Sequence, residues 1–238
     1  MSVGIMSAMD IEMELYLDRC EIQRSVQRAG LTVHEAAWGG HDLVLVKAGV
    51  GKVNAALCTQ LLIDAFEATA VLCTGSAGAL VPSLDIGDIV VGTDCVQHDL
   101  VVNFMGLPRG QVPFTHHRFF ETDPMLRRYA LEASLPEHNI VEGRILTGDR
   151  FVEDDRHRRQ IQEDLHGHCV EMEGAAVGQV CTVNEVPYLV VRAISDRADG
   201  TSDIDFESFL QDAARSSSQI VLQMLDALSP GFASSATP

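Results

Sequence analysis

Carboxylates stand out in this sequence because several of them follow apolar runs. Glu12 follows the first apolar run of the chain, and Asp196 follows the strongest one. Glu171 and Glu173 stand one residue apart at a junction where small residues follow. Two carboxyl groups on opposite sides of a sugar can cleave a glycosidic bond, one by protonating the leaving group and one by activating water. These four acids are therefore candidates for acid–base chemistry.

An acid at the start of a helix also has a simpler explanation, because carboxylates cap helix N-termini and interact favourably with the helix dipole. Asp10 and Asp154 fit this simpler role. For Glu12, Glu173 and Asp196 together the capping explanation is weaker, because all three are expected at the same edge of one sheet.

Four other motifs are incomplete. The GVGK loop at 49–52 lacks the first glycine and the Ser/Thr of a P-loop, and Asn54 replaces the third glycine of a dinucleotide fingerprint. The string TGSAG at 74–78 lacks the first glycine of a nucleophile elbow. His166 and His168 have no second cluster to complete a zinc site. We expect neither a metal nor an organic cofactor.

Strand-like and helix-like segments alternate along the chain and must position these residues. The expected strands are 3–6, 31–38, 43–48, 70–73, 88–92, 140–147 and 188–194, with a hairpin turn at Gly39-Gly40. The expected helices are 10–29, 52–65, 123–134, 154–165, 173–184 and 206–228. This alternation predicts an α/β fold with a mixed central sheet flanked by helices, which binds ligands at the carboxyl ends of strands. We expect one domain over residues 1–229 and a disordered tail over 230–238.

Composition narrows the class of protein further. The 238 residues include 17 basic and 34 acidic side chains, a net charge of −17 that argues against nucleic acid or an anionic membrane as a partner. No apolar run reaches the length of a membrane span, and no basic N-terminal signal region is present. The six cysteines are scattered without close pairs, which is typical of reduced thiols in a cytoplasmic protein.

Nine short strings, read in order, give the chain a family resemblance over residues 1 to about 228. They are GIMSAMDIE (4–12), AGVGKVNAA (48–56), TGSAGAL (74–80), GDIVV (87–91), HD (98–99), TGDRFV (147–152), VEMEGAAV (170–177), VVRAISDRAD (190–199) and DFESFL (205–210). The chain resembles the 5'-methylthioadenosine/S-adenosylhomocysteine nucleosidases of the purine nucleoside phosphorylase and uridine phosphorylase superfamily. The resemblance implies a three-layer αβα fold and hydrolysis of 5'-substituted adenosines to adenine and the 5'-substituted ribose, in methionine salvage.

The resemblance also implies roles for the catalytic residues. Asp196, held by Ser195, corresponds to the general acid that protonates adenine at N7, which requires a carboxyl pKa raised by burial. Glu12 corresponds to the base that activates water, with Arg192 in the same water-binding cluster. Glu173 corresponds to the residue that accepts hydrogen bonds from the ribose 2'- and 3'-hydroxyls.

The remaining substrate pocket is assigned by the same resemblance. Phe151 would stack on adenine, the Val152 backbone would pair with its edge, and Met172 would pack under the ribose. Without the resemblance, plain core packing explains Phe151, Val50 and Met172 better. The other positions assigned to the pocket are Met9, Val50, Ser76, Ala77, Gly78, Glu171 and Phe206.

The resemblance further implies a homodimer in which the partner subunit closes the pocket for the 5' substituent. The closing residues would be Met105, Leu107 and Pro113. Members of the family commonly carry an aromatic residue at Met105 and isoleucines at Val50 and Val152, so the shape of this pocket is expected to differ here.

Three alternatives to hydrolysis of these substrates are open from the sequence. Phosphorolysis requires an arginine before the glycine string, but Cys73 and Thr74 precede Gly75, and Glu12 would repel phosphate. A nucleosidase that prefers aminodeoxyfutalosine, in menaquinone synthesis, would keep the same residues. A binding protein without catalysis would need neither Glu12 nor Asp196. We therefore expect an N-ribosyl hydrolase whose partners are an adenosine-derived small molecule and water.

Overall fold

A mixed β-sheet forms the middle layer of the protein. The computed structural model describes residues 2–198 and 202–230, with the backbone alone for 202–208. The strands in this part are β1 (Ser2–Ser7), β2 (Glu21–Arg28), β3 (Leu31–Trp38), β4 (His41–Lys47), β5 (Ala68–Ala79), β6 (Ile89–Gln97), β7 (Phe120–Glu121), β8 (Ile140–Thr147), β9 (Cys169–Glu171) and β10 (Tyr188–Asp196). Their order is β10-β6-β8-β9-β5-β1-β4-β3-β2, with β7 paired to β6.

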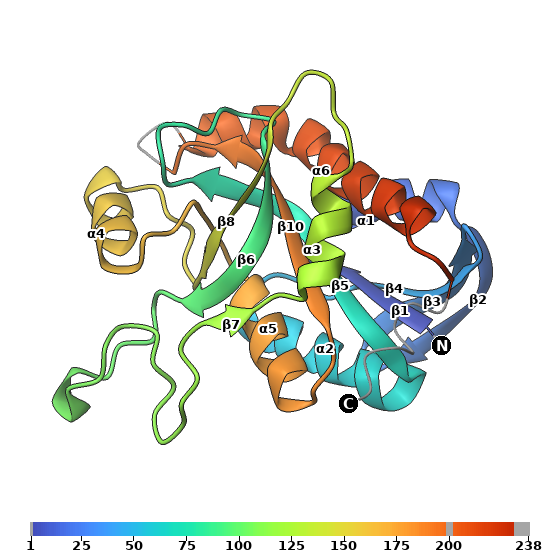
Figure 1. Cartoon of the computed structure of the whole chain (residues 1–238), viewed down its shortest axis with the longest axis horizontal. Coiled ribbons are helices and arrows are strands. Elements are labelled where there is room, and N and C mark those ends of the chain that lie inside the picture. Colours follow the sequence, from blue (N-terminus) through green and yellow to red (C-terminus); the bar gives the residue numbers. More distant parts are fainter. Residues whose placement is uncertain (1, 199–201, 231–238) are drawn as a thin grey trace.

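Helices cover both faces of this sheet (Figure 1). They are α1 (Asp10–Arg19), α2 (Lys52–Phe66), α3 (Pro124–Leu131), α4 (Asp155–Leu165), α5 (Gly174–Val183) and α6 (Ser202–Ala227), and the short 3-10 helix η1 spans Asn103–Met105. None of the helices in the described ranges combines the length and hydropathy that crossing a bilayer requires.

The described residues form three buried apolar clusters, and alternation along the strands divides neighbouring side chains between the two larger ones. In β4, Leu43 and Leu45 pack into the core beneath α1, α3 and α6, whereas Val44 and Val46 pack into the core beneath α2 and α5. A strand buried on both faces reads as a continuous apolar run, since successive side chains point to opposite faces. The expected α/β class with three layers is confirmed.

One part of the sheet closes on itself. Strand β10 pairs in parallel with β5 and antiparallel with β6, while β8 and β9 complete the path from β6 back to β5. The register places Arg192 opposite Gly75, and Asp196 opposite Gly78. Closure brings the ends of β5, β9 and β10 together, and with them the residues singled out from the sequence.

The expected helix over 10–29 is wrong in its second half. Helix α1 ends at Arg19, and β2 follows as an edge strand paired antiparallel with β3. Ala29 and Gly30 have φ values of 50° and 78°, so they form the turn between these two strands. Strand β2 is mostly exposed, so it has no buried face that would require apolar residues at every second position. Its apolar residues, Ile22 and Val26, are four positions apart, which is also the spacing of a helix.

Other differences from the expected elements concern the lengths of the strands and the residues at which helices begin. Strand β5 continues through the TGSAG string to Ala79, and β7 and β9 are too short to leave a pattern in the sequence. Helix α6 begins at Ser202, ahead of the expected start. The expected tail lies outside the described residues from 231 onward.

Candidate active site

Glu12 lies in the first turn of α1 with only 1% of its surface exposed. Its Oε2 accepts hydrogen bonds from the backbone N–H groups of Ala8 and Met9, at 3.0 and 3.1 Å. Its Oε1 accepts from the backbone N–H of Ser76 at 3.0 Å and from the Ser76 hydroxyl at 3.4 Å. Glu12 thus caps the N-terminus of its own helix, which is the simpler role considered from the sequence. It also joins α1 to β5. Burial raises the pKa of Glu12, against the opposing effect of the Arg192 charge.

Arg192 is the buried cation of the site, with 1% of its surface exposed. Its guanidinium forms ion pairs with Glu171 and, at 3.3 Å, with Oε2 of Glu173. Gly75 on the neighbouring strand is what leaves room for it. A Cβ atom at Gly75 would lie 2.6 Å from Oε1 of Glu12 and would overlap the Arg192 guanidinium. The absence of a side chain at this position therefore lets the acid and the cation approach each other.

Glu173 stands at the N-cap of α5. Its Oε1 accepts a hydrogen bond from the backbone N–H of Gly51 at 2.8 Å, while Oε2 faces Arg192. Burial raises the pKa of Glu173 to about 7, with Arg192 lowering it and Glu171 raising it to smaller extents. A carboxyl group with this pKa changes its charge near neutral pH, which is the behaviour expected of groups at functional sites.

Asp196 is the last residue of β10 and is 2% exposed. Its Oδ2 accepts a hydrogen bond from the Ser195 hydroxyl at 2.9 Å, and its Oδ1 accepts from the backbone N–H of Ala198 at 2.8 Å. A Cβ atom at Gly78 would lie 2.8 Å from the same Oδ1. The carboxyl group is thus held from two sides in a fixed orientation.

A narrow cleft of about 30 Å³ runs past Asp196. Its lining residues are Gly78, Arg150, Phe151, Val152, Val170, Glu171, Met172 and Asp196. Six of these eight belong to the set expected from the sequence, and Arg150 and Val170 were missed. The cleft combines an aromatic ring, a thioether and carboxyl groups, which can stack on a flat base and hydrogen-bond to a sugar, but its volume in this structure accommodates little more than a water molecule.

The other expected residues fall into three groups. Met9 precedes α1, Val50 precedes the Gly51 N–H that reaches Glu173, and the carbonyl of Ala77 accepts from the Ser195 hydroxyl at 3.4 Å. The side chain of Phe206 lies outside the described residues. The segment that carries η1 (Asn103–Met105) extends away from the sheet (Figure 1). Met105, Leu107 and Pro113 are not among the residues that line the cleft beside Asp196.

Two residues that contact Glu171 and Arg192 were not identified from the sequence. The Thr147 hydroxyl hydrogen-bonds to Glu171, and the Cys73 sulfur lies 3.5 Å from the Arg192 guanidinium. Thr147 begins the string 147–152, which is the signal that could have found it. Among the side chains that the structure describes, those of residues 2–198 and 209–230, no group of three or more His, Cys, Asp or Glu is placed to hold a metal ion.

Comparisons with known proteins place this geometry in context. Residues 2–226 match the phosphorylase superfamily. The 5'-methylthioadenosine/S-adenosylhomocysteine nucleosidase of Anoxybacillus flavithermus is 37% identical over 233 residues, which cover 96% of this chain and 99% of that protein.

Two solved structures are similar over nearly the whole chain. The nucleosidase of the same name from Neisseria meningitidis, in complex with methylthio-immucillin-A, has a TM-score of 0.92 at 36% identity, covering 95% of this chain and 99% of that one. Futalosine hydrolase of Helicobacter pylori has a TM-score of 0.90 at 33% identity, covering 95% and 98%.

Proposed function

The chain belongs to the phosphorylase superfamily and, within it, to the 5'-methylthioadenosine/S-adenosylhomocysteine nucleosidases, and we propose how its buried carboxyl groups carry out the reaction. The enzyme is an N-ribosyl hydrolase, which releases adenine and a 5'-substituted ribose. The observation that carries the assignment of roles is that two buried acids have different surroundings, Glu12 beside Arg192 and Asp196 beside the cleft.

Asp196 serves as the general acid in this proposal. It gives its proton to N7 of adenine, and the electron pair of the N9–C1' bond leaves with the base. The Ser195 hydroxyl and the Ala198 N–H hold the carboxyl group in place for this transfer. A positioned acid or base contributes roughly 10²–10⁴-fold to such a rate.

Glu12 serves as the general base. It takes a proton from water as the water oxygen forms the new bond to C1', while Arg192 and Ser76 help to fix the water. Glu173 accepts hydrogen bonds from the ribose hydroxyls and favours the positive charge that develops on the sugar ring. Phe151 and Met172, which line the cleft, contact the base and the ribose.

The charges around Arg192 favour water over phosphate as the nucleophile. Phosphate would need an unpaired cation, but the Arg192 guanidinium is paired with Glu171 and Glu173 and lies near Glu12. Lys52, the last residue of the GVGK string, is also paired, with Asp99 at 2.7 Å.

Adenine release from methylthioadenosine, measured with and without phosphate, tests this choice. We expect equal rates and free methylthioribose as the product. An obligatory requirement for phosphate, with formation of methylthioribose 1-phosphate, would show that the enzyme is a phosphorylase.

Substrate preference is a finer question within the same reaction. The similarity to futalosine hydrolase makes a futalosine-type nucleoside a second candidate substrate beside the two adenosines. Values of kcat/KM on methylthioadenosine, S-adenosylhomocysteine, 5'-deoxyadenosine and aminodeoxyfutalosine would rank them. We propose methylthioadenosine and S-adenosylhomocysteine as the preferred pair, in methionine salvage.

We also propose a homodimer in the cytoplasm. The rings of Phe104 and Phe114, on the segment that leaves the protomer, are 91% and 94% exposed, and Val53 on α2 is exposed as well. A partner subunit would bury such side chains and would bring Met105 to the half-exposed Val50 of the other pocket. The six free and buried cysteines support a reducing compartment.

A further inference from the structure

We infer that Glu171, which the sequence placed among the substrate-binding residues, is instead a positioning residue that holds Arg192 and leaves Glu12 and Glu173 free to act. The inference deepens the proposed hydrolysis and rests on it. It comes from the hydrogen bonds that Glu171 makes and from the number of charges that share one buried site.

The oxygens of Glu171 are turned toward the protein. Oε1 accepts a hydrogen bond from the Thr147 hydroxyl. Oε2 accepts from the backbone N–H groups of Glu173 and Gly174, at 3.0 and 2.8 Å, and from the Arg192 guanidinium. Glu171 therefore touches the end of β8, the start of α5 and the middle of β10 at once.

The Thr147 hydroxyl extends this network. It donates to Glu171 and accepts a hydrogen bond from the backbone N–H of Ala175 at 2.7 Å. Three N–H groups of the first turn of α5 are thus satisfied by Glu171 and Thr147 together, which is what a buried helix N-terminus requires. The same contacts fix the position from which the Glu173 side chain projects.

Charge balance gives Glu171 a second effect. Three buried carboxyl groups, Glu12, Glu171 and Glu173, surround the single guanidinium of Arg192. Breaking a buried ion pair by removing one partner leaves an uncompensated charge, which is strongly unfavourable. Without Glu171, the cation would be drawn onto Glu173, 3.3 Å away, and would compete with the ribose hydroxyls for that carboxylate.

The same charge balance affects the pKa values of Glu12 and Glu173. Glu171 raises the pKa of Glu173, and Arg192 lowers the pKa of both Glu173 and Glu12. The acid limb of the pH–activity profile therefore depends on how far Glu171 neutralises Arg192. The titratable groups facing this pair from the surrounding elements are Glu12, Cys73, Cys95, Cys169 and Glu173.

The test is the pH profile of Glu171→Gln. We expect kcat to fall by about 10²-fold, with a smaller change in KM, and the acid limb of kcat/KM to move to lower pH by about one unit, since Arg192 is no longer neutralised. Glu163→Gln, on the exposed surface of α4, is the matched control and should keep the wild-type profile. A Glu171→Gln enzyme with wild-type kcat or an unmoved acid limb would overturn the inference.

Glu171→Asp separates positioning from charge and guards against a glutamine variant that fails to fold. It keeps the negative charge, so the acid limb should stay at the wild-type pH, while its shorter side chain should lower kcat by about tenfold or more. Full wild-type kcat in Glu171→Asp would contradict the positioning role.

Binding of methylthio-immucillin-A across pH, by calorimetry, gives a readout that needs no turnover. We expect the pH dependence of its affinity to shift in Glu171→Gln, and an unshifted dependence would overturn the inference. Failure of the wild-type enzyme to release adenine would overturn the proposed function instead, and the calorimetric result would still decide the role of Glu171.

Discussion

The active site and the outer surface of α4 use the same residue types with opposite results. On α4, Asp155 pairs with Arg158 at 2.5 Å and with Arg159, and these hydrogen bonds lower its pKa. In the site, Glu173 also faces an arginine, yet its pKa rises to about 7 because burial outweighs the ion pair. The comparison shows that exclusion of water, and not the choice of acid and base, raises the pKa of a carboxyl group toward neutrality.

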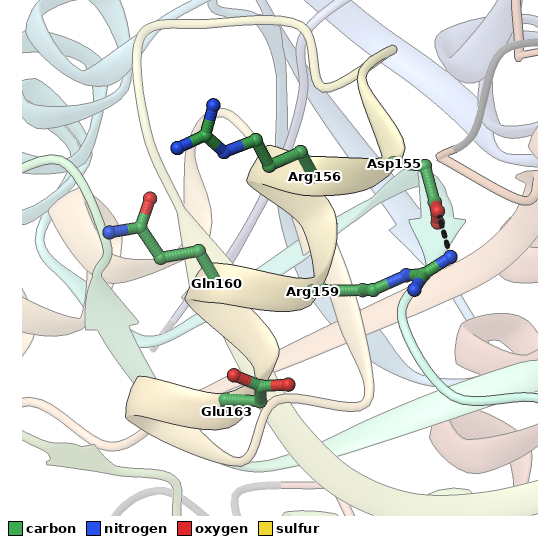
Figure 2. Close-up of a pocket in the computed structure, with 5 residues that line it drawn as sticks. All are labelled: Asp155, Arg156, Arg159, Gln160 and Glu163. Atoms are coloured by element: carbon green, nitrogen blue, oxygen red, sulfur yellow. Dashed lines mark hydrogen bonds and ion pairs between the residues drawn. The ribbon is translucent and has the colours of Figure 1, made fainter.

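The volumes of the two hollows do not indicate which region is the active site, although a larger volume would be expected there. The hollow along α4 is about 460 Å³ and far larger than the cleft beside Asp196. Figure 2 shows its lining side chains spread along one helix, with Asp155 joined to Arg159. No lining group there is buried, so water competes for every charge, and the hollow is a surface between solvated side chains.

The largest effect that separates the two regions is expected from Asp196→Asn. An asparagine keeps the shape but has no acidic proton for N7, so kcat should fall by roughly 10²–10⁴-fold while methylthio-immucillin-A still binds. Adenine release measures the first quantity, and calorimetry measures the second. A fully active Asp196→Asn enzyme would remove the general-acid assignment.

A smaller effect is expected on stability, and it concerns Glu173. Its pKa is raised from 4.5 to about 7, so between these values the folded protein holds a proton that the unfolded chain has lost. The free energy of unfolding should therefore decrease as pH rises through this window.

Glu173→Gln removes this titration. Its unfolding free energy should depend less on pH between 5 and 7.5 than that of the wild type, by about 1 kcal/mol or more. Urea unfolding at the two pH values measures the difference. Equal slopes in both proteins would mean that burial does not control this carboxyl group.

The smallest effect is expected from Asp155→Asn on α4. Exposed ion pairs contribute little and are screened by salt, so kcat/KM should change by less than about twofold and the midpoint of thermal unfolding should hardly move. A tenfold loss of kcat/KM would show that α4 takes part in the reaction and that the contrast drawn between the two regions is incorrect.

The sequence predicted much of the fold because most strands are buried on both faces. Continuous apolar runs such as 43–48 and 188–194 gave the interior strands close to their observed bounds. Strand β2 was missed because it is exposed, and exposed residues carry no burial pattern. The extension of β5 through Gly75 and Gly78 was missed because glycines in a strand signal a turn unless a neighbour fills their space.

What the sequence alone determined was the alternation of elements, the family, and four carboxylates placed after apolar runs. These follow from local patterning, which is encoded within short segments. Only the tertiary structure decided which charges meet, because the ring of β5, β10, β6, β8 and β9 joins residues that lie far apart in the chain. Glu171 beside Arg192 is the clearest case: neighbouring strand ends and a closed sheet bring them together, and the low dielectric of that interior makes their pairing matter.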